Sequence, residues 1–130
     1  MCLTTITKQV KRTSNKPNWA WKGIFRFRGQ VFSGLRGARL VTGRWFRDPN
    51  KGFIEGLNKC RFNYETQRYE YVKTWSYPKG FHVVTTRKAA VLFGRPVRVR
   101  VRHVHTWGLQ SGEDCMVARE IFIPRRRRRR

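Results

Sequence analysis

The chain has 130 residues, a length that fits one domain with a modest hydrophobic core. Thirty Lys and Arg residues stand against seven Asp and Glu residues, which gives a formal net charge of +23 at pH 7. Such an excess destabilises a compact chain unless a polyanion screens it, while a hydrophobic content of 39% excludes a wholly disordered basic tail. The six terminal arginines supply only part of the charge, so the globular part is basic as well.

The cysteines are odd in number and widely spaced, and none forms a C-x-x-C pair. They are Cys2, Cys60 and Cys115. This spacing predicts neither a disulfide framework nor a zinc ribbon, and it favours a reducing compartment. The first twenty residues contain no apolar signal-peptide region, and no run approaches the roughly 18 to 20 apolar residues of a membrane span. We therefore expect a protein that is neither secreted nor inserted in a membrane.

The first 22 residues are basic and contain no acid. Lys11 and Arg12 lie here with three further lysines, and "TSNKPN" has the composition of a loop. We therefore expect residues 1–22 to form a flexible basic arm outside the folded domain.

Residues 23–123 are predicted to form a single β-rich domain. "GIFRFRGQVFS" predicts two short strands, and "ARLVTGRWF" continues the β pattern up to a turn at "RDPNKG". "CRFNYETQRYEYVKTW" then predicts a hairpin whose aromatic residues share one face.

The second half of the domain contains the one convincing helix pattern. "TTRKAAVLF" predicts a short helix capped by Thr85 or Thr86, and strand patterns follow from residue 95 and in "CMVA" and "EIFI". The fold class is therefore α+β: a small, mostly antiparallel β-sheet or partial barrel with one short helix. Residues 124–130 follow as a solvated poly-Arg tail.

The predicted strand from residue 95 alternates valine with arginine, so that its two faces differ sharply. The residues concerned are Val97, Val99 and Val101 on one face and Arg98, Arg100 and Arg102 on the other. His103 breaks the alternation, which indicates a bulge or a reversal of the buried face there. No acid occurs from Arg95 to Gly112, and guanidinium groups spaced at roughly 7 Å suit repeated contact with a sugar-phosphate backbone. The alternative is an ordinary solvated sheet face.

The stretch "WAWKGIFRFR" interleaves aromatic rings with cations. The candidate binding residues in it are Trp19, Trp21, Arg26 and Arg28. The two tryptophans lie outside the strand pattern and are candidates for stacking on unpaired bases. Phe25 and Phe27 are instead expected in the core.

The arginine tail is a further candidate contact with nucleic acid. It consists of Arg125, Arg126, Arg127, Arg128, Arg129 and Arg130. Binding by such a run displaces counterions, so it is independent of sequence and strongly dependent on salt.

The sequence gives weak support to two chemical roles, a metal site and an N-terminal nucleophile. A metal site could be assembled from His82, His103 and His105 with Cys60 and Cys115, but the sequence lacks a second close pair of ligands. Cys2 would become an N-terminal thiol nucleophile if Met1 were removed, although a small residue there is also unremarkable. We expect no metal and no cofactor.

Three segments resemble a loose group of small uncharacterised phage and prophage proteins. The segments are "MCL", "YPKGFHVVTTRKAA" and "SGEDCMVAREIFI". Such proteins carry a Gly-Phe-His strand before an Ala-bearing helix and a valine-rich strand. The resemblance implies a phage origin and a location in the host cytoplasm or nucleoid, or inside the virion.

The order of elements is also similar to that of small ADP-ribosyltransferase folds. In that family a histidine holds the nicotinamide ribose and a late glutamate orients the acceptor, and His82 and Glu113 would take these roles here. The early motif that completes the NAD pocket in that family has no counterpart in this chain.

Charge and patterning together predict a protein that binds DNA or RNA mainly through the phosphate backbone, with little sequence preference. The contacts would come from the arginine row, the N-terminal arm and the tail. Two alternatives stay open: an ADP-ribosyltransferase-like enzyme, and a structural component buried in a nucleoprotein or virion assembly.

Overall fold

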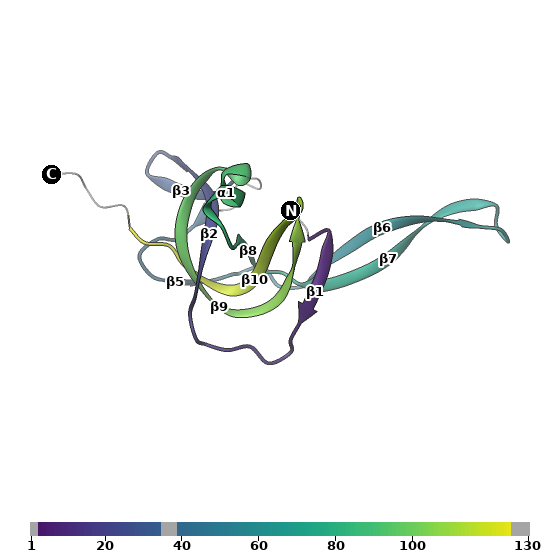
Figure 1. The fold of residues 1–130 in the computed structure, drawn as a ribbon, viewed down its shortest axis with the longest axis horizontal. Coiled ribbons are helices and arrows are strands. Elements are labelled where there is room, and N and C mark those ends of the chain that lie inside the picture. The colour runs from purple at the N-terminus through teal and green to yellow at the C-terminus, as the bar shows by residue number, and fades with distance from the viewer. Residues whose placement is uncertain (1–2, 35–38, 126–130) are drawn as a thin grey trace.

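The computed structural model describes residues 3–34 and 39–125, without the side chains of residues 55–61 and 71–75. Its main sheet contains eight strands, all paired antiparallel. These are β1 (Thr5–Gln9), β2 (Asn18–Phe27), β3 (Gln30–Ser33), β4 (Arg39–Leu40), β5 (Trp45–Arg47), β8 (Phe81–Val84), β9 (Arg95–Gln110) and β10 (Glu113–Phe122). A separate hairpin of β6 (Phe53–Asn63) and β7 (Arg68–Pro78) projects away from this body (Figure 1).

The main sheet closes on itself through its longest strand. The order is β1-β9-β10-β8-β2-β3-β4, with β5 on β10, and β9 also pairs with β2, so that β9, β10, β8 and β2 form a ring. The curved β9 and β10 strands wrap around the body in Figure 1. The mostly antiparallel β-structure with one short helix agrees with the sequence prediction.

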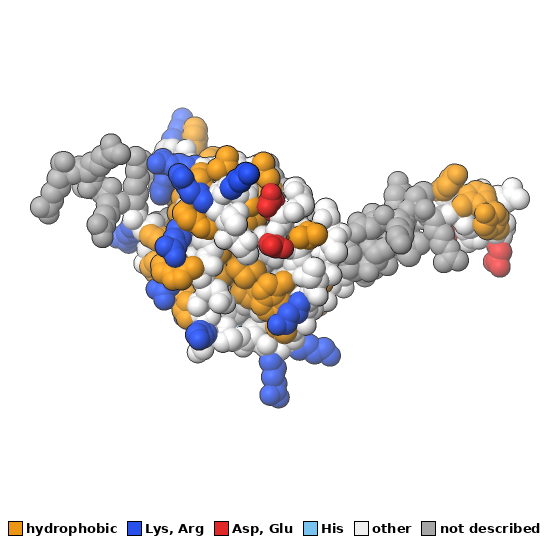
Figure 2. Space-filling model, viewed as in Figure 1, with side chains coloured by type: hydrophobic (Ala, Val, Ile, Leu, Met, Phe, Trp, Pro, Cys, Tyr) orange, Lys and Arg blue, Asp and Glu red, His pale blue; other side chains and the backbone are white. Residues whose placement is uncertain are grey.

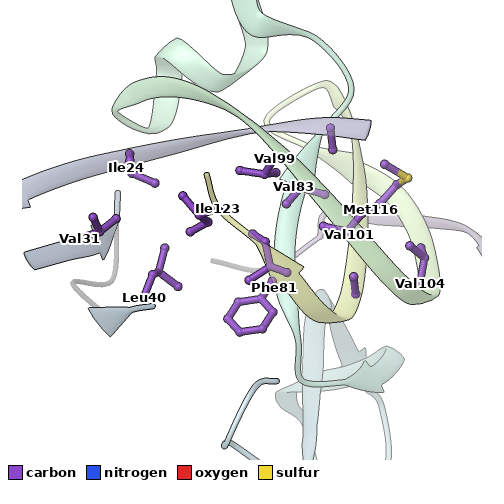
Figure 3. Packing of buried hydrophobic residues seen from close by; sticks show 13 residues of the cluster. Ile24, Val31, Leu40, Phe81, Val83, Val99, Val101, Val104, Met116 and Ile123 are labelled. Atoms are coloured by element: carbon purple, nitrogen blue, oxygen red, sulfur yellow. The ribbon is translucent and has the colours of Figure 1, made fainter. Parts of the chain in front are cut away.

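The core consists of two clusters of buried residues, the first of which lies inside this ring. Valines of β9 and β8 pack with Phe81 and Ile123 in the interior cluster (Figure 3), in which Val99 and Val101 are fully buried. A second cluster contains Ala89 of the helix α1 (Arg87–Ala90), and the following 3-10 turn η1 (Val91–Phe93) packs Phe93 against it. The Thr86 hydroxyl caps α1 by accepting from the Ala89 N–H at 3.2 Å, as the sequence predicted.

The predicted alternation along β9 is confirmed. Val99 and Val101 are buried, whereas Arg98 is exposed and Arg100 is half-buried on the other face. The break of phase is confirmed as well: His103 has a φ of 57°, and Val104 and Thr106 pair with the consecutive β10 residues Ala118 and Val117, which makes a bulge.

The prediction that residues 1–22 form an arm outside the domain is wrong for most of this segment. β1 pairs with β9 from Thr5 to Gln9, β2 begins at Asn18, and Leu3 is fully buried. The physical reason is that β9 extends beyond β2, and its free edge there is covered by the Thr-rich β1.

The structure also corrects the expectation for two phenylalanines of β2. Phe25 and Phe27 were expected in the core, but they are 42% and 59% exposed. The inward positions of β2 are occupied by Ala20 and Ile24, and Phe25 stacks on Phe32 of β3 at a ring distance of 5.3 Å. The alternation was therefore correct, but its buried face was assigned the wrong way round.

The β6–β7 hairpin is longer than the predicted one and ends in an aromatic cluster. The Phe62 ring lies 5.0 Å from Tyr64 and 5.1 Å from Tyr69, and both tyrosines are largely exposed. Among the described residues, no helix has the length and apolar content required to span a membrane.

Candidate nucleic-acid interface

Four strands present one continuous row of side chains on the outer face of the body. Trp19 of β2 pairs with Arg100 of β9, Arg100 pairs with Phe122 of β10, and Phe122 pairs with Trp45 of β5. Directly paired residues of antiparallel strands point to the same face of a sheet. We call these four residues, with Arg98 and Arg102 beside them, the outer row.

Arginines contact the tryptophan rings at both ends of the outer row. The guanidinium carbon of Arg98 lies 4.4 Å from the centre of the Trp19 ring, and that of Arg100 lies 5.4 Å from it. Trp45 contacts Phe122 at 5.8 Å. A guanidinium group over a ring keeps its in-plane N–H donors available, so these contacts orient the arginines without using their hydrogen-bonding capacity.

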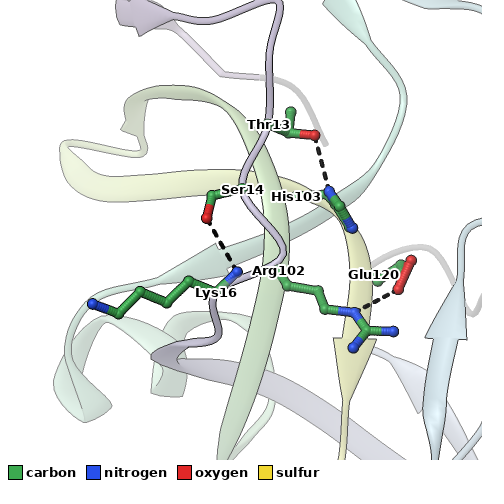
Figure 4. Close-up of polar contacts among 6 residues, drawn as sticks. All are labelled: Thr13, Ser14, Lys16, Arg102, His103 and Glu120. Carbon is green, nitrogen blue, oxygen red and sulfur yellow. Dashed lines mark hydrogen bonds and ion pairs between the residues drawn. The ribbon is translucent and has the colours of Figure 1, made fainter.

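Arg102 differs from the other two arginines because it is paired with an acid. Its Nε donates to Glu120 Oε1 at 2.6 Å (Figure 4). Its guanidinium carbon lies 4.2 Å from the centre of the Trp45 ring. Glu120 is 9% exposed, so the ion pair is partly shielded from water. Arg102 therefore compensates a local acid and supports Trp45, and it adds less free positive charge than Arg98 or Arg100.

The basic segment before β2 is hydrogen-bonded to His103 of β9, the residue that follows Arg102. The His103 N–H donates to the Ser14 carbonyl at 2.9 Å, and the Thr13 hydroxyl lies 3.0 Å from His103 Nδ1 (Figure 4). Lys11 and Arg12, which precede Thr13, are exposed. These contacts place two predicted binding residues close to the outer row.

Trp21, Arg26 and Arg28 do not belong to the outer row. Trp21 pairs with Arg98 and so faces the same side of the sheet, but it is half-buried against the second cluster. Arg26 and Arg28 are seven and nine residues from Trp19 along the chain, so Arg26 is about 23 Å away at the rise of a strand. Arg28 lies in the turn after β2, with its guanidinium carbon 5.3 Å from the Phe27 ring centre.

The start of the arginine tail lies near β5. Gly43 donates its N–H to the Ile123 carbonyl at 2.7 Å, and the exposed Arg125 lies against Gly43. The predicted contacts of Arg126 to Arg130 fall outside the described residues.

On the face of the body seen in Figure 2, hydrophobic and basic side chains lie side by side and acidic ones are few. Sequence reasoning missed two members of the outer row, Trp45 and Phe122. Both were placed on strands, but their proximity depends on the pairing of β5 with β10, which joins segments about 75 residues apart. The chain carries no local signal for that pairing.

His82 and Glu113, the two residues of the ADP-ribosyltransferase hypothesis, lie far apart. His82 Nε2 is 2.9 Å from the Tyr77 hydroxyl, which also accepts the Leu3 N–H. His82 pairs with Val117, four residues along β10 from Glu113, so their backbones are about 13 Å apart. The fold does not bring these two side chains together.

Two buried titratable groups of β9 and β10, His105 and Cys115, are held in their neutral forms. Burial, with a smaller effect of Arg119, lowers the pKa of His105 to about 4, and burial raises the pKa of the Cys115 thiol to about 12. Among the described residues, no three His, Cys, Asp or Glu side chains gather to hold a metal ion. The side chain of Cys60 and all of Cys2 lie outside the described part.

Comparison of the chain with protein-family models, curated proteins and solved structures gave no significant match. The resemblance to phage and prophage proteins and the similarity to ADP-ribosyltransferases therefore stay predictions.

Proposed function

We propose that this protein binds single-stranded nucleic acid on its outer row, through the backbone phosphates and by stacking of unpaired bases. The observation that carries the proposal is the alignment of Trp19, Arg100, Phe122 and Trp45 across four strands. Three inter-strand steps span about 14 Å, which gives room for more than one unstacked base. Surfaces that bind single strands without sequence preference combine a basic groove or face with such aromatic rings.

The electrostatics of the outer row support an anionic ligand. Arg98 and Arg100 have no acidic partner among the described residues, and the nearby acid Glu120 is already paired with Arg102. Lys11 and Arg12 extend the basic surface at one end. A phosphate backbone that crosses the outer row at β9 would meet Arg98 and Arg100 and would release counterions, so that binding would weaken with salt.

Single strands are favoured over duplexes because the described elements offer little for reading a groove. The major groove admits a helix or a two-stranded ribbon. Among the described residues, α1 and η1 are each about one turn long. The β6–β7 ribbon has a suitable shape, but near its tip Glu65 and Glu70 offset the charges of Arg61 and Arg68, so this end has no net positive charge for a phosphate-lined groove.

The test compares single strands with duplexes under conditions in which the tail cannot dominate. Nuclease-treated full-length protein and a variant with Arg125 to Arg130 replaced by Gln are titrated into a labelled thymidine 20-mer, a uridine 20-mer and a duplex of equal length, across a salt series. The proposal expects the Gln variant to retain salt-dependent binding that is tighter for the single strands. Equal affinity for the duplex would contradict the stacking component, and loss of all affinity with the tail would contradict the site.

A further inference from the structure

A cavity of about 280 Å³ opens where two strands of the ring separate. β2 and β8 share a single pair, Trp21 with Val84. β2 pairs with β9 from Asn18 to Ile24, and its pairing with β3 begins only at Ile24. The walls of the cavity include the side chains of Phe46, Phe81 and Leu40. The cavity is distinct from the outer row, and the inference drawn from it does not depend on nucleic-acid binding.

Lys22 is buried in the wall of this cavity with unused donors. It is 7% exposed, and its Nζ donates to the His82 carbonyl at 2.8 Å. An ammonium group has three N–H donors, and Lys22 has no second partner among the described residues. Burial lowers the pKa of Lys22 to about 8, so the group is still mostly protonated at pH 7. A charge held this deep without full compensation is costly, and a ligand that supplies acceptors would relieve that cost.

Gln110 provides a second buried donor in the same cavity. It is 3% exposed and lines the cavity from the end of β9. Its Oε1 accepts from the Cys115 thiol at 3.6 Å, whereas its Nε2 has no partner in the structure. Buried amide nitrogens are nearly always satisfied in folded proteins, so an orphaned one in a cavity wall indicates a place for an acceptor.

The charges at the mouth of the cavity favour an anion. Arg39 and Lys79 line it with exposed basic side chains, against one acid, Asp48. The aromatic walls described above add a surface for an apolar group. Ligand sites in proteins commonly combine apolar walls with a few convergent polar groups in this way.

We propose that the cavity binds a small organic anion, in which a carboxylate or phosphate is joined to an apolar group the size of one ring. The anionic oxygens accept hydrogen bonds from Lys22 Nζ and Gln110 Nε2, and the apolar group packs against Phe46 and Phe81. Since Lys22 already satisfies the His82 carbonyl, the competing explanation is a purely structural lysine in a cavity that holds only water.

The test uses full-length protein and three probes: benzoate, phenyl phosphate and the neutral analogue benzamide. Binding is measured by isothermal titration and by the shift of the melting temperature, at a salt concentration that suppresses surface binding of anions. We expect saturable binding of one molecule per chain for benzoate or phenyl phosphate, and the preferred probe distinguishes a carboxylate site from a phosphate site. Benzamide should bind at least tenfold more weakly than the preferred anion.

Two variants and one control assign the binding to the cavity. Lys22→Met and Gln110→Met should each weaken binding of the preferred anion by about tenfold or more, because each removes a buried donor. Lys88→Met removes an exposed charge on α1 and should leave the affinity unchanged. Near-UV circular dichroism of each variant shows whether it is folded, and the Gln110 variant decides the question if the Lys22 variant is not. Absence of saturable binding, or equal affinity in a folded donor variant and Lys88→Met, would overturn the proposal.

Discussion

Arg98 lies with its guanidinium carbon 4.4 Å from the centre of the Trp19 ring, on adjacent strands and on the outer face of the body. The Trp19 side chain is nevertheless 57% exposed, so part of the ring is open to a ligand. An exposed tryptophan held by a cation adds little to folding, since most of its surface stays in water. In the function proposed above, the exposed part of this ring is the surface on which a base stacks.

Replacement of Trp19 tests the stacking contact. Trp19→Leu should weaken binding of a thymidine 20-mer by about tenfold, because the loss of one base–aromatic stack costs roughly 1 to 3 kcal/mol. The melting temperature should change little, since the side chain is largely exposed. Trp19→Phe, which keeps a ring, should recover part of the affinity. Fluorescence anisotropy with the labelled oligonucleotide measures both variants, and an unchanged affinity for Trp19→Leu would remove Trp19 from the site.

Glu120→Gln should have opposite effects on binding and on stability. It releases Arg102 from its ion pair and adds one net positive charge to the outer row, so single-strand affinity should rise and the salt slope should steepen by up to about one unit. Stability should fall by about 1 kcal/mol or less, because the pair is only partly buried. Urea unfolding and the salt series measure the two effects. A decrease in affinity would show that Arg102 needs Glu120 to be positioned.

Gly108→Ala should detach β1 from the sheet. A Cβ at this position would overlap the Thr5 carbonyl oxygen, so β1 would have to move. Amide hydrogen exchange of Thr5 to Gln9 should then become fast, while the amides of β10 stay protected. Fast exchange of β1 already in the unmodified protein would mean that this segment is an arm after all.

The neutral His105 should make the protein sensitive to mild acid. The pKa of His105 is lowered from 6.5 to about 4, so between these pH values the unfolded chain takes up a proton that the folded protein does not. Stability should therefore fall as pH falls from 6.5 to 4, by an amount on the order of 3 kcal/mol from this group. His105→Phe should remove that part of the pH dependence. Urea unfolding at several pH values checks this against the carboxylates, which titrate in both proteins, and parallel curves for the two proteins would contradict the prediction.

Much of the fold could be predicted from local patterns in the sequence. Alternation along residues 97–101 set the buried and exposed faces of β9, and the Thr86 cap fixed the start of α1. The same reasoning misplaced Phe25 and Phe27, because alternation gives two faces but does not say which one is buried. It also placed β1 outside the fold, since charge and loop composition cannot show that a distant strand has an uncovered edge.

The candidate site could be predicted only in part, because its pieces are far apart in the chain. The sequence alone identified Arg98 and Arg100 as part of a row of arginines and Trp19 as a candidate for stacking on bases. Trp19 and Trp45 flank the arginines because β2 pairs with β9 and β5 pairs with β10. The Glu120 partner of Arg102 is likewise a product of strand register rather than of local sequence.

The most direct test of nucleic-acid binding on the outer row compares two charge-matched double variants in the protein whose Arg125 to Arg130 are replaced by Gln. Arg98→Gln with Arg100→Gln removes two charges from the outer row, and Arg26→Gln with Arg28→Gln removes two charges elsewhere on the basic surface. The salt dependence of thymidine 20-mer binding is measured for both. The outer-row variant should lose affinity by about tenfold or more and flatten the salt slope, while the other variant stays close to the parent protein. Equal losses in the two variants would show that only the overall charge attracts nucleic acid, and would contradict a site on the outer row.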